Sequence, residues 1–295
     1  MEPFGAMATA APTAYRETVP PLLHRCYRNS LSGTFAWKRL MDKNWNNRVF
    51  QNNVDAYVSP SREIAETHSL MGLPKERIHI IPNACRDRSQ SSIVANHHHN
   101  RGGIYIGRLS LEKGVDVLID AWKTVDAPLT IIGTGPEEDH LRKKAAANPS
   151  IKFLGHLPQN EAADHLARAA FLVFPNRWAE PFGLSIIEAM AAGRPVIASK
   201  LGAPAEIIQS GYNGLIVPPE NPRALRTAID EMIRHPRKTD TLGQAARQTY
   251  LARYTPEIHA DRLECLLKQT IDRSSQTPIA GHRSSLSANP TESIS

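Results

Sequence analysis

Two basic side chains stand five residues apart in a short segment bounded by glycines, and their types suit a phosphorylated ligand. Arg108 and Lys113 lie between Gly107 and Gly114, directly after a short apolar run. Lysine supplies a point charge and arginine a planar fork of donors, so the pair can hold both charged groups of a pyrophosphate. The alternative is a pair of solvated surface cations. Their joint position within one turn favours anion binding.

A second glycine-rich turn follows the next apolar run and argues against a nicotinamide or flavin site. Gly133 and Gly135 match the first two glycines of the dinucleotide fingerprint, but Glu138 occupies the position of the third. A carboxylate at that position would oppose a closely approaching pyrophosphate. The two glycines predict a turn whose backbone can lie close to a ligand, with a plain tight turn as the alternative.

A later helix is predicted to carry a carboxylate where an apolar residue is expected. Leu184, Ile187 and Ala191 are predicted to form its apolar stripe, and Glu188 falls within that stripe. Burying an unpaired charge is costly, so Glu188 needs hydrogen-bond donors. Ligand hydroxyl groups could supply them, and an internal salt bridge is the alternative.

The start of the same helix is a candidate anion site. The backbone amides of Gly183 and Leu184 lack partners within the helix and would face an anionic ligand. Glu180 lies just before them, either as part of the same pocket or simply as a favourable charge near a helix start. Together these features predict one pocket flanked by a carboxylate and an amide-rich turn.

Alternating apolar runs and amphipathic stretches must position these residues. Buried strands are predicted at Ile104–Ile106, Leu129–Ile132, Ile151–Leu154, Phe171–Phe174, Val196–Ala198 and Leu215–Val217. Helices are predicted at Val115–Val125, Glu137–Ala147, Glu161–Ala169, Gly183–Ala192 and Ala224–Ile233. Parallel strands need crossover connections, which helices supply, so the fold class is α/β with a doubly wound, Rossmann-like parallel sheet. Ligands of such sheets bind beyond the carboxyl ends of the strands.

The first hundred residues show less order. Val54–Val58 and Ile78–Ile81 are predicted strands near the end of a first, partial Rossmann-like domain. Apolar periodicity is then lost, and His97, His98 and His99 are interpreted as part of a polar linker rather than a metal site. The end of the chain is rich in Ser, Pro and Thr and is predicted to be disordered. The predicted divisions are a partial N-terminal domain (1–86), a linker (87–103), a C-terminal domain (104–270) and a tail (271–295).

Composition excludes several classes of protein. The 295 residues are 41% hydrophobic and 22% charged, which excludes disorder throughout the chain. No apolar run approaches the roughly 20 residues of a membrane-spanning helix, and no secretory signal is recognised. Cys26, Cys85 and Cys265 are too far apart for a metal or disulfide framework. A cytoplasmic protein is therefore expected.

The net charge of +6 favours anionic partners, and residues 1–99 contribute most of it with 12 basic and 8 acidic side chains. Phosphates and a lipid surface both fit this bias, so peripheral contact with the inner membrane surface stays open. Nucleic-acid binding is not expected, because aromatic residues make up only 6% of the chain and no recognition motif occurs.

The motifs together resemble the donor-binding half of glycosyltransferase family 4, the group 1 glycosyl transferases. The resemblance rests on Gly107-Arg108 with Lys113-Gly114, on the E-x₇-E pair of Glu180 and Glu188 within Glu180-Pro181-Phe182-Gly183-Leu184, and on Glu188-Ala189-Met190-Ala191-Ala192-Gly193-Arg194-Pro195-Val196. It covers about residues 100–270, and residues 26–83 resemble the end of the family's first domain. The resemblance implies a two-domain GT-B protein that uses a nucleotide sugar, retains anomeric configuration and needs no metal or other cofactor.

The same resemblance implies roles for individual residues. Arg108 and Lys113 would hold the donor pyrophosphate and stabilise the departing nucleoside diphosphate, and Glu180 would contact the transferred sugar, so these three are the catalytic candidates. Glu188 would accept hydrogen bonds from the ribose, and the region of Gly155 and His156 would meet the base. The full set of predicted donor-binding residues is Gly107, Gly133, Gly135, Gly155, His156, Phe182, Gly183, Leu184 and Glu188, with no metal ligand.

The expected function is therefore transfer of a sugar from a nucleotide sugar to an unidentified sugar or lipid-linked acceptor, as in polysaccharide biosynthesis. The alternative is a non-catalytic nucleotide-sugar-binding module, or a fragment that lacks the acceptor site, because fewer than 90 residues stand where the family carries its acceptor-side domain. A Rossmann oxidoreductase is a third interpretation, opposed by Glu138. The leading interpretation requires Arg108, Lys113 and Glu188 to face one pocket.

Overall fold

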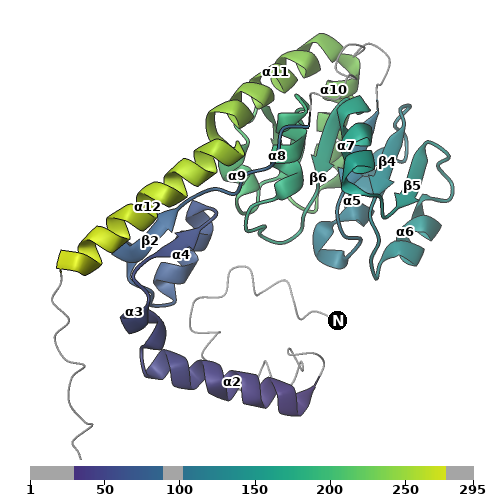
Figure 1. Ribbon diagram of the computed structural model, residues 1–295. Coiled ribbons are helices and arrows are strands. Elements are labelled where there is room, and N and C mark those ends of the chain that lie inside the picture. Colours follow the sequence, from purple (N-terminus) through teal and green to yellow (C-terminus); the bar gives the residue numbers. More distant parts are fainter. Residues whose placement is uncertain (1–29, 89–101, 277–295) are drawn as a thin grey trace, which may run out of the picture.

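The computed structural model describes residues 30–88 and 102–276, and its main feature is a six-stranded parallel sheet between two layers of helices (Figure 1). The strands are β3 (Gly103–Ile106), β4 (Leu129–Ile132), β5 (Ile151–Gly155), β6 (Phe171–Phe174), β7 (Val196–Ser199) and β8 (Gly214–Val217). Their order is β5-β4-β3-β6-β7-β8, and all neighbours pair in parallel. The predicted α/β fold class is confirmed, and each of the six predicted strands is present to within one residue at either end.

Strand alternation divides the interior into two hydrophobic cores. In β6, Phe171 and Val173 belong to one core, whereas Leu172 and Phe174 belong to the other. The first core is covered by α5 (Val115–Trp122), α6 (Glu138–Ala145) and α10 (Pro222–Arg234). The second is covered by α7 (Gln159–Arg168), α8 (Leu184–Ala191), the short α9 (Pro204–Ile207) and part of α11 (Pro236–Arg253). Both faces of the central strands β6 and β7 are buried, which explains why these strands are nearly continuous apolar runs.

The N-terminal unit is small. It comprises α2 (Leu31–Asn46), α3 (Val49–Asn53), β1 (Tyr57–Ser59), α4 (Arg62–Leu70), the 3₁₀ turn η2 (Lys75–Arg77) and β2 (Ile78–Ile80). β1 and β2 form a two-stranded parallel sheet. Helix α2 was not predicted from the sequence, although Ser30 carries its start signal, with an Oγ that accepts a hydrogen bond from the Gly33 amide at 3.1 Å.

Several contacts join this unit to the larger domain. The Glu206 carboxylate of α9 accepts hydrogen bonds from the backbone amides of Arg62 and Glu63, at 3.0 and 2.9 Å, at the positive end of the α4 helix dipole. The final helix, α12 (Pro256–Gln276), runs past β2 (Figure 1), and a ring nitrogen of His259 lies 2.8 Å from the Pro82 carbonyl oxygen.

The boundaries of the linker and the tail differ in part from those predicted. Asp87 and Arg88 lie against the larger domain, and Gly103 already begins β3. Helix α12 continues to Gln276 and so includes the first six residues of the predicted tail. The remaining predicted linker, including His97, His98 and His99, lies outside the described residues, as do Cys26 and residues 277–295. No helix within the described ranges has the length and apolar character needed to cross a membrane.

Candidate functional site

The order of the sheet reverses between β3 and β6. From β3 the chain adds β4 and β5 in one direction, and it then returns through α7 to add β6, β7 and β8 in the other. The crevice beyond the carboxyl ends of the strands at such a reversal is the usual ligand site of an open α/β sheet. The turns that follow β3, β4 and β6 carry the predicted site residues and meet at this edge.

Backbone contacts hold the turns after β3, β4 and β5 together. The Gly107 amide donates to the Ile132 carbonyl oxygen at 3.0 Å, and the Gly133 amide donates to the Gly155 carbonyl oxygen at 2.7 Å. Gly133 has a φ of +135°, and a Cβ at this position would lie 1.9 Å from the Gly107 carbonyl oxygen. Only glycine fits this close backbone approach, so the turn carrying Arg108 is fixed by its neighbour.

The glycine at position 135 has a packing role of the same kind. A Cβ on Gly135 would lie 2.2 Å from the Leu109 carbonyl oxygen, and Leu109 is fully buried. Gly135 therefore packs against the turn that follows β3, and it does not line the cavity described below. This corresponds to the plain tight turn that the sequence left open.

Arg108 projects its side chain from a fixed backbone into solvent. The buried Tyr105 hydroxyl donates to the Arg108 carbonyl oxygen at 2.8 Å, and burial raises the pKa of this hydroxyl far above its ordinary value. The Arg108 side chain is exposed, and no carboxylate of residues 30–88 or 102–276 pairs with it. Its charge therefore remains available to a ligand.

Lys113 and Glu180 are paired directly. Lys113 Nζ donates to Glu180 Oε2 at 2.6 Å, and Asn176 Nδ2 donates to the same oxygen at 2.8 Å. The two ionised side chains keep only 23% and 21% of their exposure, and Asn176 is almost fully buried with its Oδ1 unpartnered among the described residues. The sequence did not predict that one predicted catalytic charge would neutralise another.

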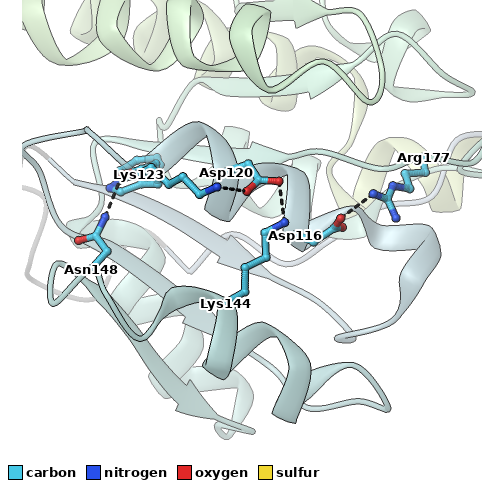
Figure 2. A network of polar contacts seen from close by, with 7 residues as sticks. Asp116, Asp120, Lys123, Lys144, Asn148 and Arg177 are labelled. Atoms are coloured by element: carbon cyan, nitrogen blue, oxygen red, sulfur yellow. Dashed lines mark hydrogen bonds and ion pairs between the residues drawn. The ribbon is translucent and has the colours of Figure 1, made fainter.

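A polar network ties the turn after β6 to the start of α5. Figure 2 shows Arg177 reaching Asp116, where its Nη2 donates to Oδ2 at 2.6 Å, while the Arg177 amide donates to the Glu112 carbonyl oxygen at 2.9 Å. In the same view Asp120 pairs with Lys144, at 2.6 Å, and so joins α5 to α6. The contacts of Arg177 hold the turns that carry Lys113 and Glu180 in a fixed position relative to each other.

A cavity of about 600 Å³ opens between the strand ends and the helices α7 and α8. Five predicted site residues line it, namely Gly107, Arg108, Gly133, His156 and Glu188. Seven others lie outside its wall, namely Lys113, Gly135, Gly155, Glu180, Phe182, Gly183 and Leu184. Polar lining residues that sequence reasoning missed are Arg86, Arg88, Thr134 and Gln159, and apolar side chains such as Ile106, Ile132 and Leu166 form the rest of the wall.

Glu188 is half-buried in the wall of this cavity. Burial raises the pKa of its carboxyl group above the usual range, against a hydrogen bond from Gln159 and the charge of Arg88, which both lower it. Arg108 and Glu188 thus line one cavity, whereas Lys113, the third residue that the leading interpretation required there, lies outside its wall. A carboxylate with this burial and few fixed donors can accept hydrogen bonds from ligand hydroxyl groups.

The predicted apolar stripe of α8 is wrong in one member. Leu184 is 52% exposed, whereas the buried residues of the helix are Ile186, Ile187, Ala189, Met190 and Ala191. The helix is apolar around most of its circumference, so periodicity alone could not identify which side faces the core. The tertiary structure leaves Leu184 on the open side of the helix start.

The two residues before Leu184 offer no side chain to a ligand. Phe182 is 4% exposed, and its ring packs edge-on against Tyr254 with centroids 6.0 Å apart. Gly183 adopts a φ of +89° at the cap of α8. Phe182 is thus a core residue whose side chain is unavailable to a ligand.

Comparisons with known proteins agree with this architecture. The family model described as glycosyl transferases group 1 matches residues 96–249. An uncharacterized glycosyltransferase of Methanocaldococcus jannaschii is 35% identical over 158 residues, which are 53% of this chain and 45% of that protein. D-rhamnosyltransferase WbpZ of Pseudomonas aeruginosa is 32% identical over 156 residues, which are 52% of this chain and 41% of that protein. The match thus spans less than half the length of each relative.

Solved structures share the fold at lower sequence identity. The crystal structure of Anabaena HepE in complex with UDP superposes with a TM-score of 0.67 at 22% identity, covering 73% of this chain and 64% of that one. Sucrose-phosphate synthase from Thermosynechococcus elongatus gives a TM-score of 0.67 at 24% identity, covering 77% of this chain and 61% of that one.

Proposed function

The chain belongs to the group 1 glycosyl transferases and has their GT-B-like α/β fold, and from this premise we propose that it transfers a sugar from a nucleotide sugar to an acceptor. The reaction proceeds with retention of anomeric configuration and without a metal ion. The larger domain is the donor-binding domain, and the smaller N-terminal unit lies on the acceptor side.

One observation carries this proposal: Arg108, the glycine turns and Glu188 converge on a single cavity at the reversal point of the sheet. The apolar part of the wall suits the flat base of a nucleotide, near His156. Glu188 suits the ribose, because its carboxylate can accept hydrogen bonds from two hydroxyl groups. Arg108 and the closely packed turns after β3 and β4 suit the diphosphate.

Lys113 and Glu180 serve the reacting end of the donor, beside the Arg108 turn. As the bond between the sugar and the diphosphate breaks, negative charge develops on the departing phosphate oxygen. Arg108 and Lys113 stabilise that charge electrostatically, and Glu180 contacts the sugar while holding Lys113 in place. The backbone of Phe182, Gly183 and Leu184 contributes further contacts to sugar and phosphate.

The acceptor is a sugar or a lipid-linked sugar. A relative described as phosphatidyl-myo-inositol mannosyltransferase of Mycobacterium leprae, 34% identical over 164 residues, supports a lipid-linked acceptor, and one described as glycogen synthase of Mycobacterium tuberculosis, 34% identical over 153 residues, supports a polysaccharide. We place the protein in the cytoplasm, at the inner membrane surface when its acceptor is lipid-linked.

The direct test incubates the purified chain with UDP-, GDP- and ADP-sugars and measures nucleotide binding and nucleoside diphosphate release. We expect one nucleotide series to bind, and the Arg108→Ala/Lys113→Ala pair to abolish that binding. The matched control, Arg223→Ala/Arg237→Ala, replaces two exposed basic residues that do not line the cavity, and it should keep the binding. Donor binding without release in the presence of candidate acceptors would identify a nucleotide-sugar-binding module instead, and the absence of any binding would refute both.

A further inference from the structure

The chain crosses from the N-terminal unit to the larger domain along residues 81–88, here called the crossing segment. Its centre is fixed by the last turn of α11. Tyr250 Oη donates to the Cys85 carbonyl oxygen at 2.9 Å, and the Cys85 amide donates to the Tyr254 carbonyl oxygen at 3.3 Å. Cys85 also packs against the hydrophobic core of this face. The segment is therefore held in place by hydrogen bonds to both the amide and the carbonyl group of Cys85.

A second anchor follows two residues later. The Arg247 guanidinium pairs with the Asp87 carboxylate and also donates to the Ala191 carbonyl oxygen at 2.5 Å, so it links the crossing segment to α8. Cys85 and Asp87 thus both contact the α11 side. The two residues that alternate with them along the chain, Arg86 and Arg88, line the cavity instead.

Arg86 and Arg88 both line the cavity that contains Arg108 and Glu188. Arg88 Nη1 donates to Asn160 Oδ1 at 2.6 Å, at the start of α7, and its charge lowers the pKa of Glu188. Arg86 is exposed, and no carboxylate of the part of the chain described here pairs with it. The crossing segment therefore brings two positive charges to the cavity, although it is not one of the turns that follow the strands of the large sheet.

The charges around the cavity favour a ligand with two negative charges. Three arginines and one glutamate are the ionisable Arg, Lys, Asp and Glu residues of its wall, which leaves an excess of two positive charges. Lys113, by contrast, is already neutralised by Glu180. A nucleoside diphosphate joined to a sugar carries two negative charges, and arginine binds phosphate oxygens in a bidentate geometry.

We propose that Arg86 and Arg88 are diphosphate-binding residues of the donor site, which act from the crossing segment together with Arg108. This inference rests on the proposed function and adds two residues to its site. Because the cations come from the connection between the two units, the affinity for a diphosphate depends on the contacts of that connection with α11. The nucleoside part of the ligand is held by the remaining wall of the cavity, so its affinity depends less on these two charges than that of the diphosphate does.

The test compares ligands that differ only in the diphosphate. UDP, GDP and ADP are titrated into the full chain by calorimetry, and the tightest binder is compared with its parent nucleoside. The variants are Arg86→Ala/Arg88→Ala and the charge-preserving Arg86→Lys/Arg88→Lys. Arg223→Ala/Arg237→Ala is the matched control that removes two exposed positive charges elsewhere. Thermal unfolding of each variant verifies that the fold is kept.

We expect the alanine pair to weaken diphosphate binding roughly 10-fold or more while nucleoside binding stays within about twofold. The lysine pair should recover part of the loss, and the control should bind like the natural sequence. Equal weakening of nucleoside and diphosphate, or no weakening of either, would overturn the assignment while leaving the proposed function intact. A folded natural chain that binds none of the three nucleotides would overturn the proposed function itself and this inference with it.

Discussion

Lys113 and Glu180 lie 67 residues apart in the sequence, yet Lys113 Nζ and Glu180 Oε2 are 2.6 Å apart and join the turns that follow β3 and β6. The contact has an electrostatic consequence. A lysine that is already paired attracts a diphosphate less strongly than a free one, because Glu180 cancels part of its field and repels the same phosphates. Glu180 is therefore expected to lower the affinity for the product diphosphate, whatever it gains from its proposed contact with the sugar.

Replacing Glu180 by glutamine should separate binding from turnover. Glu180→Gln frees Lys113 and removes a repulsive charge, so we expect nucleoside diphosphate affinity to rise about fivefold, equivalent to roughly 1 kcal/mol for a partly exposed pair. Sugar transfer should fall about 100-fold or more, because the contact with the transferred sugar is lost. Calorimetry and a turnover assay measure the two effects. Glu264→Gln, which breaks the exposed pair with Lys268, is the control and should change neither. A parallel fall in affinity would contradict this account.

Replacing Glu188 by glutamine should raise the stability of the folded protein but weaken nucleotide binding. Its raised pKa means that the folded protein holds the proton more tightly than the unfolded chain does. The carboxyl group therefore opposes folding above its raised pKa, and this cost disappears as the pH falls through that value and the group becomes neutral. Glu188→Gln should make the ligand-free protein more stable than the natural chain at pH 8, by an amount that shrinks towards acidic pH.

Urea unfolding of both proteins at several pH values checks the stability effect. The same variant should bind its nucleotide about 10-fold more weakly, because an amide accepts fewer hydrogen bonds from ribose hydroxyl groups than a carboxylate does. A stability difference that is constant with pH would show that burial of the charge is not its cause.

Gly133 should tolerate no side chain. Gly133→Ala would place a Cβ 1.9 Å from the Gly107 carbonyl oxygen, so we expect a loss of about 3 kcal/mol or more in the free energy of unfolding, together with loss of nucleotide binding as the Arg108 turn moves. Gly211 is the matched control, since its φ of +83° is also positive but no atom lies within 4 Å of its Cβ position. Gly211→Ala should cost about 1 kcal/mol and keep binding. Similar losses in both variants would exclude the close approach as the cause.

Chelation should leave the reaction unaffected. In the proposed mechanism the positive charges of Arg108 and Lys113, with those of the crossing segment, offset the charge of the departing diphosphate. Sugar transfer measured with and without EDTA should therefore proceed at the same rate. A loss of activity on chelation that Mg²⁺ or Mn²⁺ restores would contradict this mechanism and assign the charge neutralisation to a metal ion.

The sequence by itself determined the architecture of the larger domain. Parallel strands buried on both faces are continuous apolar runs, so Phe171–Phe174 could be located without any knowledge of its neighbours. The same holds for α10, whose start is marked by Asn221, with an Oδ1 that accepts a hydrogen bond from the Ala224 amide at 2.9 Å. Such signals depend only on neighbouring residues in the sequence, so they can be recognised without knowing how the rest of the chain packs.

Only the tertiary structure decided which side chains share the cavity. Arg86 and Arg88 precede a segment without periodicity, so the sequence placed them at a domain boundary. Contacts of Cys85 and Asp87 with α11 hold this segment beside the cavity that Glu188 also lines. The exposure of Leu184 was likewise undecidable locally, because α8 is apolar on most sides. Contacts between residues distant in sequence depend on how strands and helices pack together, and no local pattern encodes that packing.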